Sequence, residues 1–253
     1  MVGFPEKLPL LSTRILIAIV GACAVAWSTF AIRTSAIGAA FAGPAMHILA
    51  EDRFSPEQLN ALTRQIDETS AVSLRPAALS DIAIIRLRLA EVAVQSGNAQ
   101  LAAAVFDNLQ TAVAAALERA PTNSFMWLTD YWAHSVRSGN PADGLKSLGM
   151  SYAEGPNEGW IAIRRNPVAL SAFPSLSERV ANQALDEFAN MVKSGFYPEA
   201  ANILAGPGWR IHDKLLARLA PIDGHDRRRF AKELETKDLK GVVVPGIDHR
   251  RPF

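Results

Sequence analysis

The chain has 253 residues, of which 49% are hydrophobic and 20% are charged, and its formal net charge is +1. This length is enough for one or two domains with a sizeable core. The near-zero charge gives no global field that would attract nucleic acid, so we expect no nucleic-acid partner. The single cysteine, Cys23, excludes an intramolecular disulfide and a zinc site built from cysteines.

Residues 15–32 form an uncharged apolar stretch that lies between Arg14 and Arg33. As a helix, these 18 residues extend about 27 Å, which is close to the thickness of a bilayer core. Lys7 and Arg14 precede the stretch, whereas only Arg33 follows it closely, and positive charge favours the cytoplasmic side. We therefore predict a cytoplasmic N-tail (1–14), a transmembrane helix or signal anchor (15–32), and a single-pass protein of the inner (cytoplasmic) membrane with a periplasmic body.

Two other interpretations of this stretch stay open. Small residues at Ala24 and Ala26 and in the later run 36–43 would suit cleavage by a signal peptidase. The run Val20-Gly21-Ala22-Cys23 is similar to a lipobox, although further apolar residues rather than a polar tether follow Cys23. Residues 33–54 remain apolar but contain Gly38, Gly43 and Pro44, so we expect a juxtamembrane segment, or a helix that lies on the bilayer, rather than a second span.

The body, residues 55–236, has the pattern of an all-α domain. Apolar residues recur at helical spacing in segment after segment, and Gly or Pro punctuates them at 97, 121, 139, 155 and 195. The run Val242-Val243-Val244 favours a strand, but Pro245-Gly246 follows at once and no partner strand is evident. We predict antiparallel helical hairpins without a sheet, followed by an extended C-terminal tail at 237–253.

Two of these hairpins resemble divergent tetratricopeptide (TPR-like) units over about residues 80–158. The first has its turn at Gly97, with Leu89 and Ala90 before it and Ala102 and Phe106 after it. The second has its turn at Gly139 and matches at Leu128, Gly144, Leu148 and Pro156. The glycine turns are 42 and 56 residues apart, whereas a strict array repeats every 34 residues, so the expected solenoid is divergent.

A narrower resemblance covers the run from Ala120 to Arg165. It contains Trp127 to Trp132, a Gly139 turn, and Gly155-Pro156 followed by Trp160 and Arg164-Arg165. This is similar to membrane-anchored tetratricopeptide-like proteins of bacterial cell-surface polysaccharide loci, and the ending Arg251-Pro252-Phe253 has a similar look. The resemblance implies a role in exopolysaccharide or O-antigen production or export, with polysaccharide assembly machinery as the partner, and it does not imply a catalytic site.

The known catalytic and nucleotide-binding motifs do not occur in the sequence. There is no Walker A loop and no His-Glu-x-x-His, and the run at Ser151 lacks the last glycine of a nucleophile elbow. The pairs His212-Asp213 and His225-Asp226 would suit a metal or acid–base cluster, but they are more typical of helix caps and turns. We therefore expect no catalytic residue, no metal and no cofactor.

Aromatic and basic residues are the candidates for binding. Tryptophan, tyrosine and arginine are over-represented at binding hot spots, and aromatic rings also stack on sugars. The candidate set is Trp127, Tyr131, Trp132, Trp160, Arg164 and Arg165. A second set, Arg227, Arg228, Arg229 and Lys232, gives a basic surface suited to anionic lipid or acidic polysaccharide.

Together these patterns predict a non-catalytic, membrane-tethered scaffold whose partners are other inner-membrane or envelope proteins. Two alternatives differ in kind. One is a protein–protein adaptor of another envelope complex, such as secretion or division. The other is a small helical hydrolase or metal-dependent enzyme that uses the C-terminal His and Asp residues.

Overall fold

The computed structural model describes residues 7–69, 74–97, 99–237, 239 and 241–247. The N-terminal residues 1–6, Asn98 of the first predicted turn and the Arg-Pro-Phe ending lie outside the described residues. The chain divides into two compact units, Met1–Gly97 and Asn98–Phe253. Within the described ranges the chain is helical and contains no strand, as the hydrophobic periodicity predicts.

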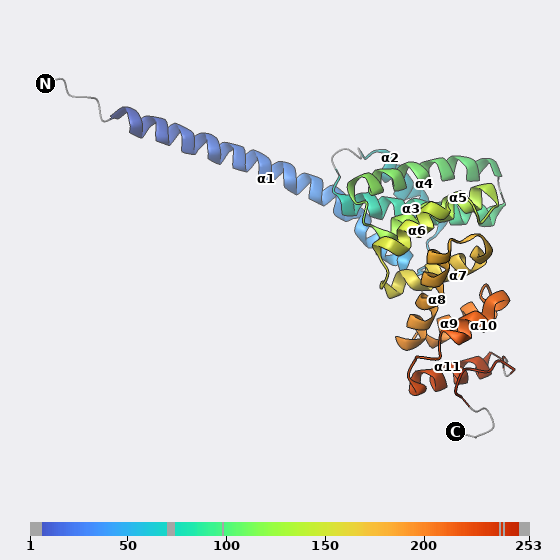
Figure 1. Ribbon diagram of the computed structural model, residues 1–253. Coiled ribbons are helices and arrows are strands. Elements are labelled where there is room, and N and C mark those ends of the chain that lie inside the picture. The colour runs from blue at the N-terminus through green and yellow to red at the C-terminus, as the bar shows by residue number, and fades with distance from the viewer. Residues whose placement is uncertain (1–6, 70–73, 98, 238, 240, 248–253) are drawn as a thin grey trace. The chain divides into compact units, whose positions relative to one another are not determined.

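The first unit begins with one long helix, α1 (Lys7–Leu49) (Figure 1). The segment Thr13–Leu49 is long and apolar enough to cross a membrane. Apolar side chains in its N-terminal half have no protein neighbours that cover them: Ile17, Val25 and Trp27 are 66%, 65% and 73% exposed. An exposed apolar surface of this length is typical of a helix whose solvent is lipid.

Residues 33–49, the main part of the predicted juxtamembrane segment, continue α1 without a break. Pro44 lies inside the helix although proline removes one backbone hydrogen bond there. The end of α1 packs on α3 (Pro76–Ser96), where Phe41 and Ala45 are buried. Burial against α3 therefore stabilises a helical segment that its Gly and Pro content alone would not.

Gly38 allows α1 to approach α3 closely. A Cβ at Gly38 would lie 2.9 Å from the Cβ of Ala78, which is closer than side chains tolerate, whereas a Cβ at Gly43 would meet nothing within 4 Å. We expect Gly38→Ala to destabilise the first unit by about 1–3 kcal/mol because the two helices must move apart. Gly43→Ala is the matched control and should be neutral or stabilising by up to about 1 kcal/mol. Thermal unfolding of the full chain in detergent, followed by circular dichroism, compares them, and equal stabilities would contradict the close approach.

Short-range signals define the other two helices of the first unit. Ser55 caps α2 (Pro56–Asp67) in a capping box with Gln58, and Pro56 occupies its first turn. The helix α3 starts at Pro76 and ends at Gly97 with a φ of 68°. Arg86 of α3 forms an ion pair with Asp67 at the end of α2, which ties these two helices together.

The second unit contains eight α-helices within its described residues. Asn123 caps one of them and Gly139 ends that same helix in the left-handed conformation, while Ser177 caps another. The helix Gly159–Ser171 contains Pro167. The helices are α4 (Ala99–Arg119), α5 (Ser124–Ser138), α6 (Leu145–Glu154), α7 (Gly159–Ser171), α8 (Glu178–Lys193), α9 (Tyr197–Ala205), α10 (His212–Ala217) and α11 (Gly224–Thr236).

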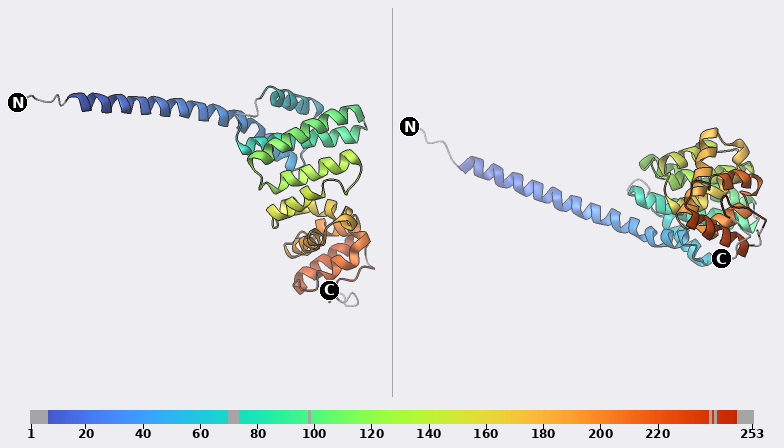
Figure 2. Two further views of the ribbon diagram at one scale, coloured as in Figure 1. Left: turned by 45° about the horizontal axis from the view of Figure 1, so that its top comes forward. Right: turned by 60° about the horizontal axis from the view of Figure 1, so that its bottom comes forward.

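These helices pack on their neighbours in the chain and on the next layer. The packed pairs include α4–α5, α5–α6, α6–α8, α7–α8, α8–α9 and α9–α11, and Figure 2 shows them stacked in chain order. In the predicted second hairpin, α5 and α6 pack together with Leu128 and Leu148 buried. The helices of the predicted first hairpin, α3 and α4, belong to different units. Kinship with tetratricopeptide repeats therefore stays a prediction.

Part of the predicted extended tail at 237–253 contributes to the core. Val242, Val244 and Ile247 are buried, whereas Val243 is 65% exposed. This alternation explains the strand-like run, because an extended segment that packs on helices also turns every second side chain inward. Arg227 of α11 donates a hydrogen bond to the carbonyl of Pro245 and holds this segment in place.

Candidate functional site

The three aromatic candidates of α5 are mainly structural. Tyr131 is buried, with its hydroxyl donating to the carbonyl of Pro141 at 3.0 Å. Trp127 is half-buried and its indole N–H donates to the carbonyl of Pro121 at 2.7 Å. Trp132 is also half-buried and stacks on Phe106 of α4 with ring centroids 5.7 Å apart. Burial removes Tyr131 from any surface that a partner could touch.

Trp160 and Arg164 of α7 remain at the surface. Trp160 is 42% exposed, and one part of its ring packs on Phe125 with centroids 4.9 Å apart. Arg164 lies one turn later and donates to the carbonyl of Trp160 at 3.2 Å. Tryptophan and arginine are both enriched at binding hot spots, so these two residues are candidates for contact with a partner.

Arg165, by contrast, is fully buried and acts as the centre of a polar cluster. Its Nε and Nη2 donate to the Oε1 atom of Glu187 at 3.0 and 2.5 Å. Nη2 also donates to the carbonyl of Gly155 at 2.9 Å, and Nη1 donates to the carbonyl of Ser151 at 2.6 Å and to the hydroxyl of Ser124 at 3.2 Å. All three guanidinium nitrogens are engaged inside the protein, so this side chain is not available to a partner.

The other groups of this cluster complete the coordination of Glu187. Its Oε2 atom accepts from the Tyr152 hydroxyl at 2.8 Å and from the Asn166 Nδ2 at 3.2 Å. The Tyr152 ring also lies under the Arg165 guanidinium, 4.1 Å from ring centroid to Cζ. The cluster joins α5, α6, α7 and α8, and buried charges of this kind are tolerated only when such hydrogen bonds satisfy them.

Tyr152 should make stability decline at high pH. Burial, followed by the negative charge of Glu187, raises the pKa of Tyr152 well above its usual value, and burial also raises the pKa of Tyr131. Above about pH 10 an unfolded tyrosine loses its proton while the folded one keeps it, so the free energy of unfolding falls by up to about 1.4 kcal/mol per pH unit and per group. Absorbance at 295 nm should show ionisation of Tyr131 and Tyr152 only together with unfolding, whereas the half-exposed Tyr197 ionises in the folded chain. Tyr152→Phe should reduce this pH dependence, and ionisation of Tyr152 near pH 10 in the folded chain would contradict its burial.

Only three of the four residues predicted to form the basic surface are exposed. Arg228, Arg229 and Lys232 are exposed on α11. Arg227 instead turns inward, where it donates to the carbonyl of Pro245. Three basic side chains therefore remain for an anionic surface.

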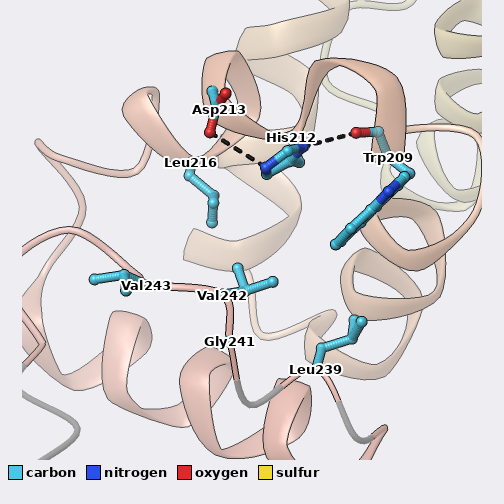
Figure 3. A pocket seen from close by; sticks show the side chains of 8 residues that line it. All are labelled: Trp209, His212, Asp213, Leu216, Leu239, Gly241, Val242 and Val243. Atoms are coloured by element: carbon cyan, nitrogen blue, oxygen red, sulfur yellow. Dashed lines mark hydrogen bonds and ion pairs between the residues drawn. The ribbon is translucent and has the colours of Figure 1, made fainter.

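A groove that the sequence did not indicate is lined by Trp209 and α10 on one side and by Leu239 and residues 241–243 on the other (Figure 3). Its volume is about 480 Å³, and Trp209, 46% exposed, stacks on His212 at one side with ring centroids 4.8 Å apart. The His212 Nδ1 donates to the carbonyl of Trp209 at 2.8 Å, and its Nε2 lies 3.2 Å from the Asp213 carboxylate. The remaining lining is apolar: Leu216, Leu239, Gly241, Val242 and Val243. The groove is therefore mainly apolar, with the stacked Trp209 and His212 rings at one side, which suits a ligand or side chain with an apolar face.

The residues considered for catalysis do not converge. His212 lines the groove, whereas His225 contacts Asp226 at 3.4 Å and is not among the residues of the groove. Ser151 is buried and its hydroxyl lies 3.1 Å from the Arg165 Nη1. In the part of the chain that the structure describes, no group of three or more His, Cys, Asp or Glu residues could hold a metal ion.

The surface features of the second unit are thus the Trp160–Arg164 pair, the groove beside Trp209 and the three basic residues of α11. Tyr131 and Arg165 belong to the interior, which sequence reasoning did not distinguish from the surface. No family model matches the chain, and neither a curated protein nor a solved structure is similar to it.

Proposed function

We propose that this chain is a single-pass membrane protein whose helical units serve as a docking platform for another envelope protein. The observation that carries the proposal is the contrast along α1. Its N-terminal half exposes Leu16, Val20 and Ile32 by 60% or more, while the end of the same helix buries Phe41 and Ala45. A water-soluble protein would gain by covering such a surface, whereas lipid covers it without any protein partner.

The proposed orientation in the membrane rests on the positive charges before the apolar stretch. Lys7 and Arg14 precede the apolar stretch, and positive-inside bias places them in the cytoplasm of a bacterial cell. Both helical units would then lie in the periplasm. A reporter that is active only in the periplasm, fused after Phe253, tests this orientation, and activity of a cytoplasmic reporter at the same position would reverse it.

The docking role rests on what the second unit offers at its surface. The buried arginine cluster is fully engaged in holding α5 to α8 together, so it contributes rigidity rather than chemistry. The exposed Trp160–Arg164 pair and the groove beside Trp209 are the surfaces with hot-spot character. We propose that one or both contact the partner and that the chain itself is not an enzyme.

The proposed partner is the machinery that makes or exports a cell-surface polysaccharide. Support comes from the resemblance of the segment 120–165 to anchored proteins of polysaccharide loci. If the proposal holds, a deletion strain loses surface polymer but still makes its lipid-linked precursor. Normal polymer in that strain would eliminate the polysaccharide role and leave the alternative of an adaptor in another envelope complex.

Site-specific crosslinking in intact membranes tests the docking surface directly. A photoreactive amino acid at Trp160 or Trp209 of the full chain should capture the same envelope protein, and the identity of that protein decides between the two complexes. The matched control is Arg179, which is exposed on α8 away from both features. Equal capture from Arg179, or none from the two tryptophans, would contradict a specific docking surface.

A further inference from the structure

The distance between the membrane and the first unit is fixed by α1 itself. The helix passes from the apolar stretch 15–32 into its contact with α3 without a break, and so no flexible linker separates the two. The stretch is about 27 Å long, slightly less than the hydrocarbon thickness of about 30 Å. With a charged residue at each end, it has little freedom to slide along the membrane normal.

The contact between Gly38 and Ala78 gives the height of α3 above the bilayer. Gly38 follows Ile32 by six residues, or about 9 Å of helix. A Cβ at Gly38 would lie 2.9 Å from the Ala78 Cβ, so the start of α3 lies beside this point of α1. Since the head-group layer is about 5–8 Å thick on each side, Ala78 sits just outside it.

The remainder of α3 leads away from the membrane. Figures 1 and 2 show α3 beginning beside α1 and extending away from its N-terminal half. The opposite direction would carry Arg86 and Arg88 into the hydrocarbon, where charged side chains are costly. The N-terminal end of α3 is therefore its membrane-proximal end.

Arg75 stands at this end. It is the residue before α3, it is exposed, and its side chain makes no capping hydrogen bond with the helix. An arginine side chain is long enough to reach phosphates from just outside the head-group layer, and arginine binds phosphate well.

We infer that the start of α3, with Arg75, lies against the phospholipid phosphates of the leaflet through which α1 leaves the bilayer. This inference rests on the proposed membrane span. The first unit then has a second function besides following the membrane span. Together, α1 and Arg75 fix the orientation of this unit at the membrane surface.

Depth measurements with the full chain in lipid nanodiscs test this placement. Cys23 is the only cysteine and lies near the centre of the apolar stretch, so a fluorophore there reports the span. In a Cys23→Ser background, Ala77→Cys reports the start of α3, and Gln95→Cys is the matched control near its far end, since both residues are exposed. Quenchers are iodide in water and a nitroxide attached to the lipid head group.

Residue 77 should be quenched several-fold more by the head-group nitroxide than residue 95, and Arg75→Glu should reduce that difference. Equal quenching at 77 and 95, with Cys23 shielded from iodide, overturns the placement of α3 but leaves the membrane span intact. Iodide quenching at Cys23 instead overturns the span itself. If Arg75→Glu leaves the difference in quenching between residues 77 and 95 unchanged, Arg75 does not take part in the contact.

Discussion

Replacing Arg165 by methionine is expected to lower the free energy of unfolding by about 3–5 kcal/mol, because it leaves the Glu187 carboxylate buried without a charged partner. Both side chains are almost completely inside the protein, with relative exposures of 0% and 4%. The substitution also removes the donors that satisfy the carbonyls of Ser151 and Gly155. Urea unfolding of the full chain in mild detergent, followed by tryptophan fluorescence, measures the change.

Two further variants make this result specific. Arg164→Met alters the neighbouring residue, which is half-exposed, and should change the free energy of unfolding by no more than about 0.5 kcal/mol. Combining Arg165→Met with Glu187→Leu removes both charges, so the double variant should lose much less than the sum of the single losses. If Arg165→Met behaved like Arg164→Met, the cluster would not be a main support of the second unit.

The pair Arg164-Arg165 also shows where sequence reasoning stops. Adjacent residues of a helix point about 100° apart, so one can face solvent while the next faces the core. We grouped both as binding candidates because their shared residue type suggested a surface role. The partners that decide otherwise, Glu187 and Ser124, are 22 and 41 residues away in the chain. No local pattern around Arg165 indicates that they will meet it.

Helix ends were the most predictable feature, because single residues determine them. Gly97 and Gly139 adopt positive φ angles that favour glycine, and Ser55 and Asn123 accept hydrogen bonds from the first turns of their helices. Helices that contain proline are harder to predict. Pro44 in α1 and Pro167 in α7 both disfavour a continuous helix, but burial of Phe41 and Ala45 in one case and of Ile161 and Ala169 in the other stabilises the helix across them.

The groove beside Trp209 could not be predicted for a similar reason. Its walls come from Trp209 and α10 on one side and from Leu239 and residues 241–243 on the other, and no local pattern indicates that these parts of the chain meet. Val242 and Val244 are buried and Val243 is exposed, which is the pattern of an extended segment that packs on one side. The sequence shows the apolar run but not the helices on which it packs. Propensity alone favoured a strand that has no partner.

Two arginines in the middle of α1 should prevent its insertion into the membrane. Ala22→Arg with Ala26→Arg places both charges near the centre of the stretch 15–32, at a cost of about 5–7 kcal/mol in transfer to the bilayer core. We expect the doubly substituted chain to leave the carbonate-resistant membrane fraction and to aggregate or be degraded. Fractionation with immunodetection of the full chain gives the measurement.

The matched control lies on the same helix beyond the predicted span. Ala42→Arg with Met46→Arg has the same spacing of four residues, and both positions are exposed, with Met46 at 72%. This pair should remain in the membrane fraction because its charges lie in water above the head groups. If both pairs released the chain, the membrane segment would extend as far as Met46, and the contact of α1 with α3 would have to form within the bilayer. If neither pair released it, lipid would not be the environment of the exposed apolar half of α1.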